Sequence, residues 1–299
     1  MTHTLPYILL MVAGMLARRI PLFPRDTDKS LNLYVIYIAL PALVFVQIPR
    51  LQFSAQILIP VIMAWATLGI SVILVMAAAR LLRWPASVRG AMLLMVPLGN
   101  TSFLGIPMVQ QYFGDAGIPY AIIYDQFGSF MALSTYGTVI LALYGQEGMA
   151  SARDMIKKII TFPPFIALTI AFVFHSFHYP VWLAKMLEMA AASLVPVVLV
   201  AIGFAMRIIP PGHEIVPLCT GLSIRLLVTP LIIIGICAGL GISGEAARVS
   251  ILESAMPPMV SAGALASIAG LEPRLTASMV GIGILASFLT LQIIFVLSG

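Results

Sequence analysis

The chain carries very little charge. Only 9% of its 299 residues are Asp, Glu, Lys or Arg, whereas 61% are hydrophobic. Soluble domains contain about 25% charged residues, so this composition excludes a soluble protein and leaves no room for a soluble catalytic or nucleotide-binding domain. The excess of Lys and Arg over Asp and Glu, 16 against 11, is therefore interpreted as loop charge that orients membrane spans, and not as a nucleic-acid surface.

Cysteine and histidine are also scarce. Cys219 and Cys237 fall in one apolar run, ~27 Å apart along a helix, and cannot form a disulfide within it. The four histidines show no metal-ligand spacing; His175 and His178 lie at the end of an apolar run and are interpreted as interfacial. The start of the chain lacks a basic region followed by a small-residue cleavage site, so we expect no removable signal peptide.

Apolar runs long enough to cross a bilayer, about 20 residues each, occupy most of the sequence. We predict an all-α polytopic membrane protein with ten transmembrane helices, nine or eleven being the alternatives, separated by short charged or Pro/Gly-containing loops. The predicted spans are residues 4–18, 31–47, 55–80, 88–113, 118–144, 160–177, 181–206, 215–240, 246–270 and 275–297.

Lys and Arg are distributed very unequally between alternate loops. The odd-numbered loops hold twelve of these cations and the even-numbered loops hold two, Arg50 and Arg248. Cytoplasmic loops are the positive ones, so we predict a protein of the cell (inner) membrane with both termini on the non-cytoplasmic side. The twelve cations are Arg18, Arg19, Arg25, Lys29, Arg80, Arg83, Arg89, Arg153, Lys157, Lys158, Arg207 and Arg274.

The two halves of the chain resemble each other. Spans 2 and 7 each contain an internal proline, Pro41 and Pro196, and spans 4 and 9 are both interrupted by Pro and Gly. Five spans per half is an odd number, so the second copy must insert upside down, as in many secondary carriers. The alternative is that these prolines are only the ones common in membrane helices. We predict one carrier domain, 1–299, with repeats 1–145 and 155–299.

The interruptions of spans 4 and 9 are the strongest functional feature. Non-helical backbone at membrane depth survives only inside protein or beside a water-filled cavity. Asn100 and Thr101 are suitable caps for a half-helix that begins near Ser102, and Ser261 for a second that runs the opposite way. Two positive half-helix ends favour an anion such as a carboxylate. The predicted substrate-binding residues are Gly99, Asn100, Thr101, Ser102, Pro107, Pro257, Pro258, Ser261 and Arg225.

Arg225, Glu253 and Asp125 lie deep inside predicted spans, where ionisable groups are functional candidates. Arg225 is either a countercharge for an anionic substrate or the partner of Glu253 or Asp125 in a structural ion pair. Glu253 stands directly before the break in span 9, and a carboxylate beside unwound carbonyls favours a cation or proton site. We predict that Glu253, with Asp125, carries the coupling ion.

The motif Asn100-Thr101-x-x-Leu104-Gly105-x-Pro107 resembles the central motif of the auxin efflux carrier family. Leu40-Pro41-Ala42 and Ala255-Met256-Pro257-Pro258 match other landmarks of that family, in order along the whole chain. The resemblance implies a ten-helix fold with crossed helices 4 and 9, shared with bile-acid/sodium symporters. It also implies a homodimeric scaffold of helices 1, 2, 6 and 7 and an elevator-like transport domain of helices 3–5 and 8–10. Only about 15 residues join spans 5 and 6, which favours a compact prokaryotic permease over an auxin exporter.

We therefore expect a secondary active or facilitative transporter of a small organic anion, a mono- or dicarboxylate. Its expected partners are the bilayer, a second copy of the chain and a proton or sodium; a proton is favoured, because the resemblance does not bring the full sodium-site pattern. The alternatives are a sodium-coupled symporter of the bile-acid type and a channel or sensor. A membrane-embedded enzyme is disfavoured by the lack of G-x-S-x-G and H-E-x-x-H motifs, and no cofactor, metal or nucleic acid is expected.

Overall fold

The computed structural model describes residues 5–24, 26–50, 55–145, 153, 156–157, 160–174, 179–206 and 214–299. Within these ranges the regular secondary structure is helical, with no strand beyond one isolated β-bridge. The prediction of an all-α polytopic membrane protein is confirmed, because six helical segments are long and apolar enough to cross a bilayer. They are Thr27–Gln47, Leu58–Leu81, Thr101–Tyr144, Val181–Ala205, Ile215–Leu240 and Pro273–Leu297. Arg25, Lys158, Arg207, His175 and His178 lie outside the described residues.

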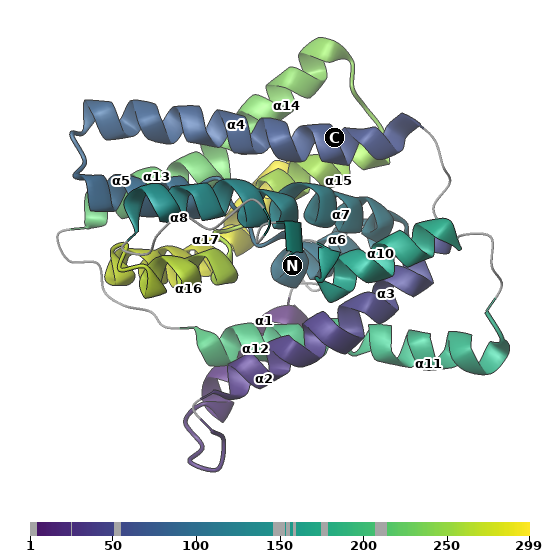
Figure 1. Cartoon of the computed structure of the whole chain (residues 1–299). Coiled ribbons are helices and arrows are strands. Elements are labelled where there is room, and N and C mark those ends of the chain that lie inside the picture. The colour runs from purple at the N-terminus through teal and green to yellow at the C-terminus, as the bar shows by residue number, and fades with distance from the viewer. Residues whose placement is uncertain are drawn as a thin grey trace.

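One group of helices packs together in the lower part of Figure 1, and we call it the first helix group. Its tightest contact joins α1 and α12, because both helices present a glycine there. A Cβ atom on Gly14 would strike the carbonyl of Val200, and one on Gly203 would strike the carbonyl of Met11. The group consists of α1 (Leu5–Ala17), α2 (Thr27–Tyr34), α3 (Leu40–Gln47), α10 (Pro163–Val173), α11 (Val181–Ala192) and α12 (Leu194–Ala205).

The remaining helices form the second helix group, most of which lies above the first in Figure 1. Its interior is filled by fully buried apolar side chains such as Val75, Met92, Leu94 and Met279. The two groups meet where α12 contacts the turn η4 (Thr101–Gly105), at the start of α6, and where α3 contacts α7. The second group consists of α4 (Leu58–Leu81), α5 (Ala86–Met95), α6 (Ile106–Phe113), α7 (Ile118–Tyr124), α8 (Thr138–Tyr144), α13 (Ile215–Ser223), α14 (Thr229–Leu240), α15 (Glu245–Ser254), α16 (Val260–Ile268) and α17 (Pro273–Leu297).

Several helices contain wide π-helical turns, and three of these turns end two residues before a proline. η1 (Val35–Ala39) precedes Pro41, η4 (Thr101–Gly105) precedes Pro107 and η8 (Ile224–Val228) precedes Pro230. Proline has no N–H, and its ring clashes with the carbonyl four residues earlier, so the turn before it must widen. Such turns often lie at functional sites, and two of these three carry predicted site residues.

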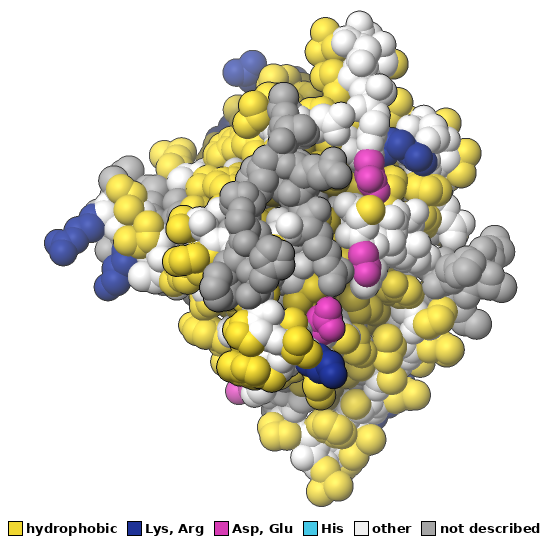
Figure 2. All heavy atoms as spheres, turned by 90° about the vertical axis from the view of Figure 1, so that its right-hand side faces the viewer, with side chains coloured by type: hydrophobic (Ala, Val, Ile, Leu, Met, Phe, Trp, Pro, Cys, Tyr) yellow, Lys and Arg dark blue, Asp and Glu magenta, His cyan; other side chains and the backbone are white. Residues whose placement is uncertain are grey.

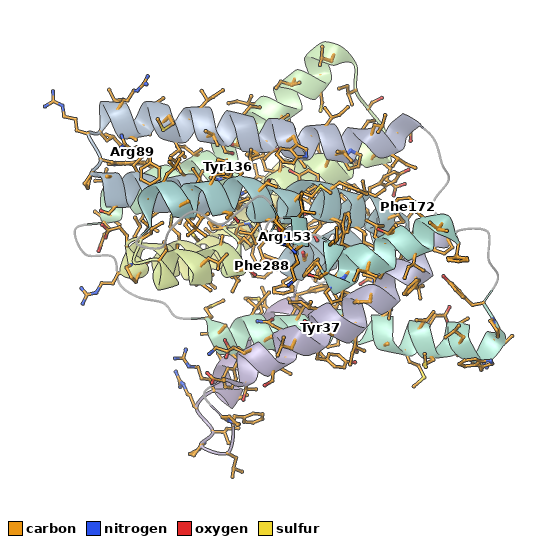
Figure 3. The ribbon with its side chains drawn as sticks, in the orientation of Figure 1. Tyr37, Arg89, Tyr136, Arg153, Phe172 and Phe288 are labelled. Carbon is orange, nitrogen blue, oxygen red and sulfur yellow. The ribbon has the colours of Figure 1, made fainter. Side chains whose placement is uncertain are left out.

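Charged side chains lie at both ends of the molecule. At the left-hand end in Figures 1 and 3, Arg89 at the start of α5 lies over the ring of Tyr144, with 5.4 Å between its guanidinium carbon and the ring centroid. Figure 2 views the opposite end, where a few acidic side chains lie among apolar ones, with Lys or Arg side chains beside some of them. The exposed acids of the described residues include Asp115, Glu188 and Glu245.

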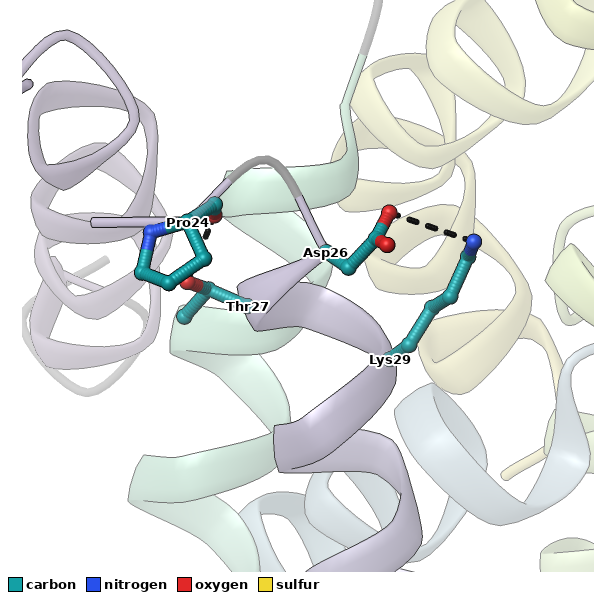
Figure 4. Close-up of polar contacts among 4 residues, drawn as sticks. All are labelled: Pro24, Asp26, Thr27 and Lys29. Atoms are coloured by element: carbon teal, nitrogen blue, oxygen red, sulfur yellow. Dashed lines mark hydrogen bonds and ion pairs between the residues drawn. The ribbon is translucent and has the colours of Figure 1, made fainter.

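The loop between α1 and α2 is held by local polar contacts, shown in Figure 4. Lys29 pairs with Asp26 at 3.2 Å, and the hydroxyl of Thr27 donates to the carbonyl of Pro24 at 2.7 Å. Both charged side chains are more than 70% exposed, so the ion pair contributes only about 0–1 kcal/mol to stability. These residues belong to a solvated loop and not to the site.

Candidate functional site

The interruptions of the two broken segments lie against each other and pair through their backbones. The first break lies between α5 and η4, and the second between α15 and α16. The N–H of Asn100 donates to the carbonyl of Pro257 at 2.8 Å, and the N–H of Met259 donates to the carbonyl of Leu98 at 2.9 Å. These bonds form an antiparallel bridge centred on Gly99 and Pro258, which satisfies backbone groups that would otherwise be unpaired in the membrane.

Arg225 joins the two breaks to the continuous helix Ile215–Leu240, which consists of α13, η8 and α14. Its Nε donates to the carbonyl of Met256 at 2.6 Å, and its Nη1 donates to the carbonyl of Pro97 at 3.3 Å. The guanidinium fits because Gly99 has no side chain, since a Cβ there would collide with it. Arg225 is 1% exposed, so its contacts are with the protein interior.

Asp125 lies at the start of η6 (Asp125–Phe130) and is also buried. The hydroxyl of Thr101 donates to its Oδ1 at 2.5 Å, and the amide of Gln126 donates to its Oδ2 at 2.6 Å. Ser102, which lines the adjoining pocket, is a third side-chain hydrogen-bond partner of this carboxyl group. Two carboxyl oxygens can accept about four hydrogen bonds, so some acceptor capacity remains. Thr101 and Asp125, predicted separately, form one polar unit in the structure.

Glu253 lies in the last turn of α15 and is 0% exposed. Neither of its carboxyl oxygens has a hydrogen-bond partner among the described residues, so Arg225 does not donate to it. The carboxyl group lies against Gly105, where a Cβ would collide with it. A buried carboxyl group without a partner is costly, which makes this position a candidate for binding a proton or cation.

We call the place where the two breaks pair, at Gly99 and Pro258, the crossing. A pocket of about 100 Å³ lies beside it and is lined by four of the predicted site residues, Asn100, Ser102, Asp125 and Ser261. Asn100 is 2% exposed, and its side-chain nitrogen has no hydrogen-bond partner among the described residues. An unpaired buried amide donor beside a pocket is suited to bind a ligand oxygen. The apolar wall consists of Ile36, Leu40, Phe103, Phe130, Leu133, Phe162 and Met259.

The half-helices begin close to the predicted positions, but with different capping. Asn100 occupies the N-cap position of η4, and its side chain makes no capping hydrogen bond. The N-cap residue of α16 is Met259, so the expectation that Ser261 caps this half-helix is wrong. Ser261 lies in the first turn, because the β-bridge at Met259 sets where helical geometry can begin. Its side chain is therefore available to the pocket.

The other predicted substrate residues hold the crossing and do not line this pocket. Gly99, Pro257 and Pro258 form the bridge and its approach, Pro107 lies in the first turn of α6, and Arg225 binds carbonyl groups. Sequence reasoning missed Gln126, which bonds Asp125, and the stacked rings of Phe130 and Phe162, whose centroids are 3.8 Å apart. Phenylalanine is abundant in membrane helices, so nothing in the sequence marked these two.

Two larger pockets lie at opposite ends of α12. One of about 360 Å³ lies beside the first half-helix, and its lining includes Gln47, Gln110 and Glu188. The other, of about 550 Å³, lies beside α16 and has Ser267 and Arg274 in its lining. Each pocket is bounded by α12 on one side and a half-helix on the other. Among the described residues, no group of three or more His, Cys, Asp or Glu side chains gathers as a metal site would require.

The chain is similar to two archaeal transporters. It is 27% identical over 298 residues to an uncharacterized transporter of Methanothermobacter thermautotrophicus, covering 97% of this chain and 95% of that one. It is 26% identical over 297 residues to an uncharacterized transporter of Methanocaldococcus jannaschii, covering 96% and 94%. A family model described as membrane transport protein matches residues 1–295. With its apolar helices and crossed broken segments, this chain belongs to the membrane transport protein family, the family of the auxin efflux carriers.

Proposed function

We propose that this membrane transporter is a secondary active or facilitative carrier of a small organic anion, a mono- or dicarboxylate, which binds in the pocket at the crossing. The observation that carries the proposal is the buried amide of Asn100, which lines the pocket without a partner. The first turns of the two half-helices add N–H groups that lack partners within their own helices. Together these donors suit a carboxylate.

We further propose the ten-span, inverted-repeat topology, with the first helix group as scaffold and the second as a moving transport domain. Helices within every predicted span support the topology. The pocket lies between the groups, because Ile36, Leu40 and Phe162 belong to the scaffold side and Asn100 to the other. The two larger pockets at opposite ends of α12 suit an elevator mechanism, in which the site is reached from either side in turn. A homodimer formed through the scaffold completes the proposal.

The coupling ion, in this proposal, binds at Glu253, with Asp125 as a second candidate. The support is the burial of Glu253 and its unpartnered carboxyl oxygens next to the first half-helix. A proton needs only one acceptor, whereas sodium needs a cage of several oxygens, so a proton fits this position better. Arg225 supplies a nearby positive charge while its hydrogen bonds go to carbonyl groups.

Counterflow in proteoliposomes tests the transport function. Vesicles preloaded with unlabelled acetate, lactate or malonate should accelerate the uptake of the same labelled acid, because a carrier exchanges ligand across its alternating site. A channel would show no such acceleration. Absence of both binding and exchange for all small carboxylates would overturn the proposal.

Replacement of Asn100 by Ala tests the pocket. The substitution removes a donor worth about 1–2 kcal/mol in a water-poor site, so exchange should fall about tenfold while the protein still inserts and folds. The matched control is Asn32→Ala on α2, which lies outside the pocket lining. Unchanged exchange kinetics in a normally expressed Asn100→Ala protein would remove Asn100 from the site.

A further inference from the structure

The pocket at the crossing has an uneven charge. Asp125 is the one ionisable side chain among its lining residues, and no Lys, Arg or His lines it within the described chain. Arg225, although close to the crossing, has two of its nitrogens committed to the carbonyls of Met256 and Pro97. A ligand in this pocket therefore meets an acidic side chain without a basic one to offset it.

The carboxyl oxygens of Asp125 accept hydrogen bonds from their neighbours. The amide nitrogen of Gln126 can only donate, so Oδ2 accepts this bond, and the Thr101 hydroxyl occupies one site on Oδ1. Ser102 is a third partner, and two carboxylate oxygens accept about four hydrogen bonds, so the carboxyl group of Asp125 can accept one more. The side facing the pocket thus suits a ligand donor, above all a cationic one.

Asn100, in the same pocket, offers a hydrogen-bond donor that needs an acceptor. The amide of Asn100 is buried, lacks a partner and can donate, as can the N–H groups of the adjoining half-helix turn. This end of the pocket suits a carboxylate. One small pocket therefore pairs a site for a carboxylate with a site for a donor or cation.

Size and lining restrict the ligand further. A volume of about 100 Å³ is smaller than the roughly 150 Å³ cavity that holds a benzene molecule. The remaining walls are apolar, with the stacked rings of Phe130 and Phe162 and the side chain of Leu133. This space fits a short ligand with at most a small apolar substituent.

We propose that the pocket binds a small α-amino acid, such as glycine or alanine, with its carboxylate on Asn100 and the half-helix turns and its ammonium group on Asp125. This inference rests on the proposed function and narrows the substrate of the same site. Dicarboxylates are disfavoured, because their second carboxylate meets Asp125. Asp125 then serves the substrate, and Glu253 alone remains for the coupling proton.

Four acids that differ mainly in the group next to the carboxylate test the assignment: alanine, lactate, propionate and malonate. Binding to the purified full chain is followed by the shift in melting temperature and by competition in counterflow. Alanine should bind at least tenfold more tightly than lactate, propionate should be weaker again and malonate weakest. The Asn100→Ala protein should lose the alanine-induced shift, which separates site binding from general solute effects.

Asp125→Asn is the decisive variant. Asparagine can keep both hydrogen bonds, by accepting from Gln126 and donating to the Thr101 hydroxyl, but has no charge for an ammonium group. The preference for alanine over lactate should then shrink to less than threefold, whereas the control Asp26→Asn on the exposed loop should retain it.

Equal or tighter binding of propionate or malonate by the parent protein would overturn the inference and leave the proposed carrier function intact. If that binding required sodium or acidic pH, Asp125 would belong to the coupling cation instead. If none of the four acids bound or exchanged, both the inference and the proposed function would be wrong.

Discussion

At the residue scale, Glu253 is distinguished by its surroundings, in which no described residue forms a hydrogen bond with its carboxyl group. A carboxyl group in the interior of a membrane protein normally finds a hydrogen-bond partner or a counter-ion. Both oxygens of Glu253 lack a hydrogen-bond partner among the described residues, and Gly105 leaves room for the group. Asp125, by contrast, accepts hydrogen bonds from Thr101 and Gln126, so Glu253 is the stronger candidate for the coupling proton in the proposed mechanism.

Glu253→Gln separates coupling from binding. Glutamine has the shape of the protonated acid, so the variant should keep substrate binding and counterflow. It should lose accumulation driven by an imposed pH gradient, measured in proteoliposomes with labelled substrate. If the Gln variant still concentrates substrate in response to the gradient as the parent does, Glu253 has only a structural role.

Arg225 has a structural role, because it holds the two breaks together, and we call this pair of contacts the Arg225 clamp. It bonds carbonyl groups that lie 31 and 128 residues away in the sequence, one in each break. Arginine suits this place because its planar fork carries several donors, whereas lysine has a single nitrogen.

Arg225→Lys should keep the positive charge but lose one of the two carbonyl contacts. We expect a loss of about 1–3 kcal/mol in stability, seen as a lower melting temperature in detergent, together with weaker exchange. The control is Arg80→Lys on the exposed end of α4, which should change neither. A melting temperature for Arg225→Lys equal to that of the parent would show that the clamp is dispensable.

At the scale of helices, close packing of α1 and α12 depends on glycine. Association of helices in a membrane relies on close backbone approach, which only small residues allow. Gly14 and Gly203 supply this approach from the two sides of one interface. In the proposed elevator mechanism, this interface belongs to the part that stays fixed.

Gly14→Ala and Gly69→Ala should therefore have opposite effects. The new methyl group at position 14 meets the backbone of α12 and should cost about 1–3 kcal/mol. At position 69, in α4, a Cβ meets nothing within 4 Å, and the more helix-favouring alanine should stabilise by up to about 1 kcal/mol. Melting temperatures of the two purified variants provide the comparison. Equal shifts in the same direction would contradict the packing argument.

For the whole molecule, the distribution of charge predicts the orientation in the membrane. Most Lys and Arg residues of the chain fall in the odd-numbered loops, and one of these loops leads into α5, where Arg89 lies at the left-hand end of Figure 3. These loops are expected in the cytoplasm, which places both termini outside.

Cysteine accessibility measures this directly. In a background with Cys219 and Cys237 replaced by Ser, a membrane-impermeant maleimide should label Arg50→Cys in intact cells. It should label Lys157→Cys only after permeabilisation. Labelling of position 157 from outside would invert the orientation, and the proposed direction of each half-helix would invert with it.

The sequence alone determined the class of the protein and the elements that matter. Low charge and long apolar runs specify membrane helices, because a charged side chain is costly in hydrocarbon whatever its neighbours. Pro97, Pro257 and Pro258 specified the breaks, because proline interrupts the helical hydrogen bonds of its own segment. Asp125, Arg225 and Glu253 stood out for the same local reason, as ionisable groups in apolar surroundings.

Only the tertiary structure decided what these groups contact. The pairing of Asn100 with Pro257, the choice of carbonyls by Arg225 and the meeting of Thr101 with Asp125 join residues far apart in the chain. The start of α16 at Val260, and hence the role of Ser261, was set by a hydrogen bond to Leu98 in the other half. Local pattern fixes where a helix breaks, but the partner that satisfies the freed backbone groups comes from packing, and packing here brings the two halves together.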